Sequence, residues 1–218
     1  MPARTRLRRA NALARPSWRA VSSALQSRTS QIRNGSLQGA VAGTPGTNPT
    51  NWTIPSVGGN ITAVALALGT ENRIEYIDVT VTASAAVAAS ILFDTTTGIT
   101  AADGQTWTSS AFVKLAGGSL SNVSLAHRVQ FRTVAGAQVT INDVALVPIT
   151  ALSRIVNTFT ASGVTIERVT NGIAVTFSGA GSITLRIGGP MMHQGVAALS
   201  PIRTAGVARS GVHVSAGR

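Results

Sequence analysis

The chain of 218 residues has no cysteine, and only 11% of its residues are charged. The absence of cysteine excludes disulfide bonds and thiolate metal sites, and it leaves the redox compartment open. The charged share is less than half of the usual value of roughly a quarter, so Thr, Ser, Asn and Gln must cover much of the surface. Disordered chains and helical bundles are both far richer in charge. We therefore expect a folded domain that is not a helical bundle.

Long apolar runs are also absent. No stretch approaches the ~20 consecutive apolar residues that a membrane-spanning helix needs, so we expect no membrane insertion. The length suits one domain of ordinary size with a tail, or two small domains.

The net charge of +11 is concentrated at the two ends of the chain. Residues 1–33 carry eight arginines and no acid, residues 34–199 carry seven basic and seven acidic groups, and residues 200–218 add three arginines. A nucleic-acid-binding domain would show a basic face across its folded body. We therefore predict that the body binds no nucleic acid.

The basic arm at 1–33 has two readings. It is either a solvated, poorly ordered terminus or an anchor for an anionic surface or another protein. The anchoring reading assigns binding to Arg4, Arg6, Arg8, Arg9 and Trp18. Pro16 would open a short helix at 16–27, with Trp18 on its apolar stripe, ready to dock on a partner or on the body. The composition resembles organellar transit peptides, but the arm lacks the apolar core of a secretory signal.

From residue 60 onward, apolar residues recur with a period of two. Ile77, Val79 and Val81 alternate with polar residues, and the segments 173–178 and 183–187 repeat the pattern. A sheet with one buried face and one solvent-exposed face is typical of antiparallel strands. Turn residues every 8–15 positions predict an all-β antiparallel β-sandwich (jelly roll) of about nine or ten strands.

Four segments follow from these patterns. We expect a basic arm at 1–33, a Gly/Pro-rich lead-in without regular structure at 34–58, the β-sandwich at 59–200 and a C-terminal tail at 201–218. No helix is expected between residues 60 and 190. Asn171-Gly172 is the best hairpin turn, because both residues tolerate positive φ.

Candidate catalytic groups are few. The three histidines have no metal-ligand spacing, no nucleophile elbow or phosphate loop is present, and the acids are dispersed. His127 is best explained as an ordinary strand residue. We expect no catalytic residue, no metal site and no cofactor.

The scarce aromatic residues suggest sugar binding, because the CH face of a sugar stacks on an exposed aromatic ring while polar groups bind its hydroxyls. Tyr76 lies on the polar side of its strand, whereas Trp107 has the phase of a core residue. Trp52 either plugs the end of the sandwich or binds ligand. The candidate carbohydrate-binding residues are Tyr76, Asp94, Asp103, Gln105 and Trp52.

Three stretches carry a family resemblance. They are residues 34–46 (NGSLQGAVAGTPG) with 49–52 (PTNW), residues 103–114 (DGQTWTSSAFVK), and residues 187–195 (IGGPMMHQG) running on to 200–204 (SPIRT). Their order and spacing resemble the carbohydrate-binding-module-like jelly-roll domains of tailed-phage and prophage structural proteins, such as tail-fibre, head-spike and gene-transfer-agent proteins. His193 stands where that family usually has Glu, so the resemblance implies no calcium site or ion pair that depends on this carboxylate.

The resemblance implies a non-catalytic virion protein that recognises bacterial surface polysaccharide. It also implies other virion subunits as partners, a homo-oligomer such as a trimer or multicopy assembly, and a place on the particle surface after synthesis in the bacterial cytoplasm without a signal peptide. Two alternatives remain. One is a purely structural virion decoration or fibre-base protein without sugar binding, and the other is a capsule-degrading glycosidase.

Overall fold

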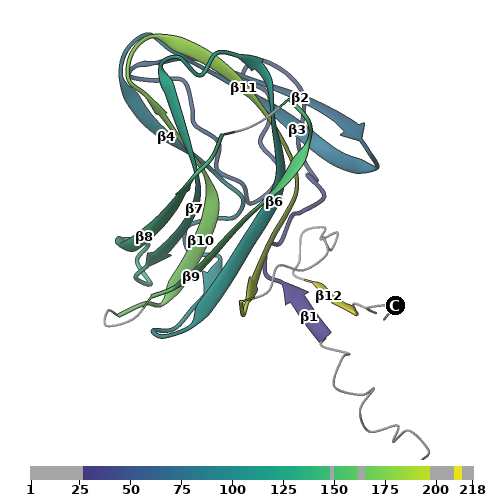
Figure 1. Cartoon of the computed structure of the whole chain (residues 1–218), viewed down its shortest axis with the longest axis vertical. Coiled ribbons are helices and arrows are strands. Elements are labelled where there is room, and N and C mark those ends of the chain that lie inside the picture. The colour runs from purple at the N-terminus through teal and green to yellow at the C-terminus, as the bar shows by residue number, and fades with distance from the viewer. Residues whose placement is uncertain (1–26, 148–149, 162–164, 197–208, 213–218) are drawn as a thin grey trace, which may run out of the picture.

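The computed structural model describes residues 27–147, 150–161, 165–196 and 209–212. These residues form strands, turns and loops, and none of them is helical. The strands, shown in Figure 1, are β1 (Ser27–Ser30), β2 (Ile61–Glu71), β3 (Ile74–Ala83), β4 (Val87–Leu92), β5 (Ile99–Thr100), β6 (Thr106–Gly118), β7 (Val123–Arg132), β8 (Gln138–Ala145), β9 (Ser153–Thr160), β10 (Arg168–Phe177), β11 (Gly181–Gln194) and β12 (Arg209–Val212).

Ten of these strands make two sheets. Sheet I has the order β2-β3-β11-β6-β9. Sheet II has the order β4-β10-β7-β8, with the short β5 also paired to β10. Every pairing within the two sheets is antiparallel. The sheets form the two layers visible in Figure 1, and one continuous hydrophobic core includes residues of both. The predicted all-β sandwich of nine or ten strands is confirmed.

The period-two pattern explains which residues fill the core. Along β3, Ile77, Val79 and Val81 are buried against sheet II, whereas the residues between them lie on the outer face. Strand β11 repeats this alternation beside β3. The burial of each large aliphatic side chain stabilises the folded state by about 1.5–3 kcal/mol, and this is the main stabilising contribution in such a sandwich. The predicted core position of Trp107 is also confirmed, since only 3% of the residue is exposed.

The predicted hairpin turn at Asn171-Gly172 is wrong. Both residues lie inside β10, which is paired on both sides with β4 and β7. A Cβ on Gly172 would lie 2.1 Å from the carbonyl oxygen of Ile91. The glycine therefore permits close approach of two strands, which is the other common reason for glycine in a sheet.

The folded body also begins earlier than expected. Residues 27–30 form β1, which pairs with β12, so strands from near both ends of the chain lie side by side (Figure 1). Ile32 is completely buried, and Arg33 pairs with Asp94. The boundary of the basic arm at residue 33 and the plain tail at 201–218 therefore need correction. The arm residues Arg4, Arg6, Arg8, Arg9 and Trp18 lie outside the described residues, as does the expected helix at 16–27 apart from Ser27.

Candidate functional site

The outer face of sheet I carries ordered rows of hydroxyl groups. Thr80 of β3 lies opposite Thr184 of β11, and their hydroxyl oxygens are 2.8 Å apart. The next outward pair, Thr82 and Ser182, has its hydroxyl oxygens 2.9 Å apart. The β-branched threonines suit extended strands, and their cross-strand hydrogen bonds fix the hydroxyls in place.

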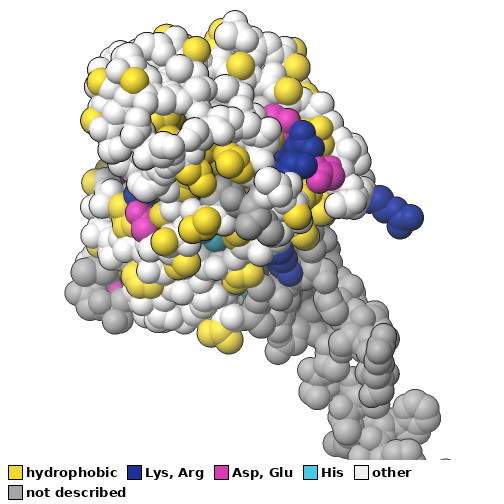
Figure 2. Space-filling view, turned by 45° about the horizontal axis from the view of Figure 1, so that its top comes forward, with side chains coloured by type: hydrophobic (Ala, Val, Ile, Leu, Met, Phe, Trp, Pro, Cys, Tyr) yellow, Lys and Arg dark blue, Asp and Glu magenta, His cyan; other side chains and the backbone are white. Residues whose placement is uncertain are grey.

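A cluster of four charged side chains continues this face along β3 and β11 and onto the neighbouring strands β2 and β6. We call it the charged cluster: Glu71 of β2, Asp78 of β3, Lys114 of β6 and Arg186 of β11. Arg186 and Asp78 are register partners, and the guanidinium donates two hydrogen bonds of 2.8 Å to the two carboxylate oxygens. Figure 2 shows basic and acidic side chains gathered in one compact group on a surface that otherwise has few charges.

Glu71 joins the two cations of the charged cluster. One of its oxygens, Oε2, lies 2.5 Å from Nη1 of Arg186 and 2.7 Å from Nζ of Lys114. Hydrogen bonds from Lys114 and then from Arg186 lower the pKa of Glu71. The hydrogen bonds that Arg186 donates to Asp78 and to Glu71 raise the pKa of Arg186. The charged cluster pairs two carboxylates with two cations, so its formal charges cancel.

The ring of Tyr76 packs against Arg186 of the charged cluster and is not fully open to solvent. The guanidinium carbon of Arg186 lies 3.6 Å from the centre of the Tyr76 ring, in cation–π contact. The ring leans across Gly69, where an added Cβ would come within 2.5 Å of ring carbon Cζ. Gly69 and Gly188 flank Tyr76 in the pairing register. Tyr76 has the outward position that its phase predicts, but the stacked guanidinium covers part of the ring that a sugar would use.

Three of the other predicted site residues have structural contacts. Asp94 is fully buried and accepts hydrogen bonds from the main chain and side chain of Arg33. Trp52 is buried against Phe93, with ring centroids 5.0 Å apart, and its indole N–H donates to the carbonyl of Asn34 at 3.0 Å. Gln105 accepts a hydrogen bond from the Ala102 amide at 2.9 Å.

The predicted site residues do not assemble into one site. Asp103 is exposed in the loop before β6. Tyr76 pairs with Gly188 of β11, which in turn pairs with Phe112 inside β6, so these three residues lie in one row across the sheet. Thr106, the first residue of the strand, lies six positions along β6 from that row, a span of about 20 Å. Of the five candidates, only Tyr76 lies on the outer face of sheet I.

Sequence reasoning missed most of the charged cluster. The alternating pattern places Asp78 and Arg186 on the polar faces of their strands, and this is the one feature of the sequence that points to the charged cluster. Their meeting depends on the pairing of β3 with β11, whose residues are about a hundred positions apart in the chain. No local spacing encodes that register.

A buried polar cluster lies between the sheets. The Oγ of Ser109 is 2.7 Å from Nε2 of His127, and Nδ2 of Asn171 donates to the same Oγ at 2.7 Å. A Ser–His pair is the core of many hydrolases, but at most 1% of any of these three residues is exposed. The cluster is therefore closed to a substrate in this structure. His127 lies in strand β7, as expected.

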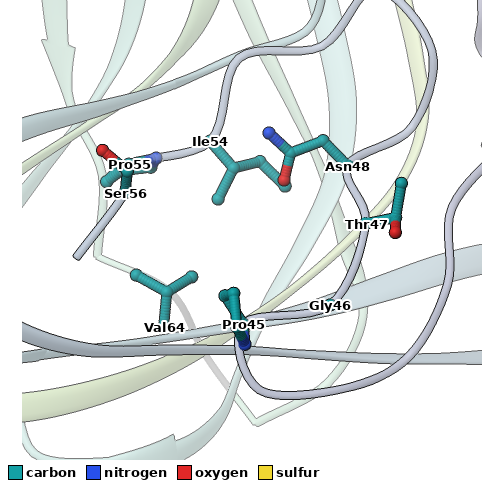
Figure 3. A pocket seen from close by; sticks show the side chains of 8 residues that line it. All are labelled: Pro45, Gly46, Thr47, Asn48, Ile54, Pro55, Ser56 and Val64. Carbon is teal, nitrogen blue, oxygen red and sulfur yellow. The ribbon is translucent and has the colours of Figure 1, made fainter.

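A hollow of about 360 Å³ lies beside β2, where Gly43 of the lead-in pairs with Leu66. Figure 3 shows Ile54 and Val64 directed toward it from opposite sides. Its lining contains no charged or aromatic side chain, and consists of Pro45, Gly46, Thr47, Asn48, Ile54, Pro55, Ser56 and Val64. It therefore lacks the groups that make the outer face of sheet I a candidate site.

The described residues offer neither a metal site nor a membrane-spanning helix. They contain no group of three or more His, Asp or Glu side chains arranged to hold a metal ion. Within the same ranges, no helix has the length and apolar character needed to cross a bilayer.

Comparisons with known proteins give fold similarity without a family. No protein-family model matches the chain, and no curated protein sequence is similar to it. Among solved structures, an arabinose-bound α-L-arabinofuranosidase (MgGH51) superposes with a TM-score of 0.53 at 17% identity, over 78% of this chain and 27% of the other.

Two further structures superpose less closely. A carbohydrate-binding module of the β-sandwich superfamily gives a TM-score of 0.44 at 16% identity, over 72% of this chain and 58% of the other. The baseplate tripod of bacteriophage Tuc2009 gives 0.45 at 18% identity, over 66% and 58%. The chain thus spans less than two thirds of the length of each. The arabinofuranosidase similarity shows a shared β-sandwich fold, and the two lower scores support no further conclusion about this chain.

Proposed function

We propose that this chain is a non-catalytic β-sandwich that binds bacterial surface polysaccharide as part of a phage or prophage particle. The observation that supports this best is the outer face of sheet I. Its hydroxyl rows, Thr80 with Thr184 and Thr82 with Ser182, continue directly into the charged cluster. Sugars present many hydroxyls that both donate and accept, and charged partners make the stronger hydrogen bonds to them.

The expected affinity of one such site is low. A dissociation constant near 1 mM corresponds to only about 4 kcal/mol. Display in many copies raises avidity by roughly 10²–10⁴. This is consistent with the multicopy virion assembly that the sequence resemblance implies. The low charge of the body also suits a ligand that is rich in hydroxyls.

The state of the carboxylates supports a binding role over a glycosidase. Glycoside hydrolysis needs one carboxyl group with a raised pKa that donates a proton to the leaving group. On the outer face of sheet I, Glu71 has a lowered pKa, and Asp78 accepts hydrogen bonds from Nε and Nη2 of Arg186. The environment of Glu71 therefore does not favour a protonated acid.

One observation favours the purely structural alternative. Strands β8 and β9 are the outermost strands of their sheets, and Val144, Val147 and Val156 on or beside them are exposed. Exposed edges with apolar side chains are suited to contacts between subunits. In that reading the sandwich holds virion subunits together and binds no sugar.

A glycan array with the full chain tests the proposal. For the array, the chain is displayed in many copies on a particle. Each polysaccharide that binds is then incubated with the chain for a long period, and its length is measured by gel filtration. Binding of at least one bacterial surface polysaccharide without shortening supports the proposal. No binding at high valency overturns it in favour of the structural alternative, and shortened chains overturn it in favour of an enzyme.

A further inference from the structure

Glu71 occupies a position that an external carboxylate could take. Lys114 donates a hydrogen bond to Oε1 at 3.0 Å, and its Nζ lies 2.7 Å from Oε2, which is also 2.5 Å from Nη1 of Arg186. The other two donor nitrogens of Arg186, Nε and Nη2, are held by Asp78. Asp78 and the Tyr76 ring therefore fix the guanidinium, while Nη1 and Nζ form a separate pair of donors aimed at one carboxylate.

We infer that this face selects saccharides that carry a carboxylate, and that Glu71 fills the carboxylate position in the free protein. The inference rests on the proposed function and names its ligand class. In the bound state, the ligand carboxylate would accept the hydrogen bonds from Arg186 and Lys114 that Glu71 accepts in this structure.

Glu71 is the member of the charged cluster that is best placed to leave. Asp78, Lys114 and Arg186 lie inside β3, β6 and β11, each of which is paired on both sides. Glu71 is the last residue of the outermost strand β2, next to the two-residue turn Asn72-Arg73. A change of its side-chain rotamer would uncover both donors without breaking a strand pairing.

Charge balance favours a carboxylate over a neutral group in that position. Without Glu71, the positive charges of Arg186 and Lys114 face only the negative charge of Asp78. The side chains are largely covered, with 17% of Arg186 and 18% of Lys114 exposed, so an unmatched cation there is costly. A ligand carboxylate restores neutrality and matches the geometry of the donors, whereas a neutral sugar leaves one cation unmatched.

The hydroxyl rows would bind the rest of such a sugar. Thr80 and Thr184 form the neighbouring pair on the outer face, two residues along their strands from Asp78 and Arg186 and about 7 Å away. Thr82 and Ser182 lie one step further. A chain of sugar units that places one carboxylate on the charged cluster would therefore lay its next hydroxyls over these side chains.

The test compares oligogalacturonate with its methyl ester, two probes that differ in the charge on the carboxyl group. Calorimetric titrations use the full chain, E71Q, and E167Q as the matched control. Glu167 accepts a hydrogen bond from the Val134 amide next to sheet II, so E167Q makes the same chemical change away from the face. We expect wild type to prefer the acid form, and E71Q to bind it at least about threefold more tightly, because the internal competitor is gone. E167Q should change the affinity for neither probe.

A second variant separates ligand binding from a purely structural role of Glu71. Lys114→Met should abolish the preference for the acid form, with circular dichroism confirming the fold. Equal affinities of E71Q and wild type for the acid form, or equal binding of acid and ester by wild type, would overturn the inference. Binding of neutral polysaccharides on the array alongside either result leaves the proposed function standing, whereas binding of no saccharide at all removes both.

Discussion

The Oγ of Ser109 in β6 lies 2.7 Å from Nε2 of His127 in β7, which joins the two sheets by a hydrogen bond inside the core. Asn171 donates to the same oxygen from β10. Buried polar groups of this kind are costly unless they are satisfied. His127 therefore makes the stability of the sandwich depend on pH.

We expect acid to destabilise the protein through His127. Burial lowers the pKa of His127 from 6.5 to about 4. Between these pH values the unfolded chain takes up a proton that the folded chain refuses, so stability is full above pH 6.5 and falls as the pH drops to 4. The difference in pKa corresponds to about 3 kcal/mol. Urea denaturation at pH 7.5 and pH 4 measures the loss, and His127→Gln should flatten the difference. An equal pH dependence in this variant would contradict the assignment.

Gly172→Ala should weaken the pairing of β4 with β10. The new Cβ would meet the Ile91 carbonyl oxygen at 2.1 Å, and backbone atoms cannot rotate away as a side chain can. We expect a loss of about 2 kcal/mol or more. Gly179→Ala is the matched control, because its nearest contact would be an ordinary 3.6 Å to Asn122. Thermal unfolding of the two variants compares them directly, and similar melting temperatures would show that the strands can separate freely.

Arg33→Met should leave the Asp94 carboxylate buried with main-chain donors only. Asp94 is fully buried, whereas about a third of the Arg33 side chain is exposed, so we expect a loss of about 2 kcal/mol, below the range for fully buried pairs. Asp94→Asn keeps an acceptor for the Thr95 amide. In a double-mutant cycle measured by urea denaturation, the two changes together should cost less than their sum. Strict additivity would mean that the pair contributes nothing to holding residues 31–33 on the body.

Gly69→Ala should displace the ring of Tyr76, which lies within 2.5 Å of the added Cβ. Tyr76 is the single tyrosine of the chain, and the three tryptophans are unchanged in the variant. The difference between the near-ultraviolet circular dichroism of the variant and of wild type at the tyrosine band therefore reports the ring. We expect a weakened tyrosine signal and a loss of saccharide affinity of about threefold, as the guanidinium of Arg186 loses its support. Unchanged affinity with a changed spectrum would show that Tyr76 is not needed to position Arg186.

The period of two was enough to predict the sandwich, because it dictates which residues face the core regardless of which strands pair. It also placed Tyr76 on the outer face. The same local reasoning failed at Asn171-Gly172, since a glycine needed for close strand approach has the same sequence signature as a glycine needed for a turn. The prediction that Asp94 binds sugar failed for a related reason. An Asp in a turn-rich segment is usually exposed, and only the distant Arg33 makes the burial of Asp94 possible.

The candidate site was less predictable than the fold. Glu71, Asp78, Lys114 and Arg186 come from four strands, and long-range pairing brings them together. Net charge and spacing do not reveal such a cluster, because its charges cancel and its members are dispersed along the chain.

A nuclear magnetic resonance titration of the ¹⁵N-labelled chain with fragments of a polysaccharide bound on the array gives the most direct test of the binding face. We expect the amide shifts to change along β3 and β11, around Asp78, Thr80, Thr184 and Arg186, and to stay constant in sheet II. Changes confined to sheet II, to the hollow beside β2 or to the edges at β8 and β9 would contradict sugar binding by the outer face of sheet I.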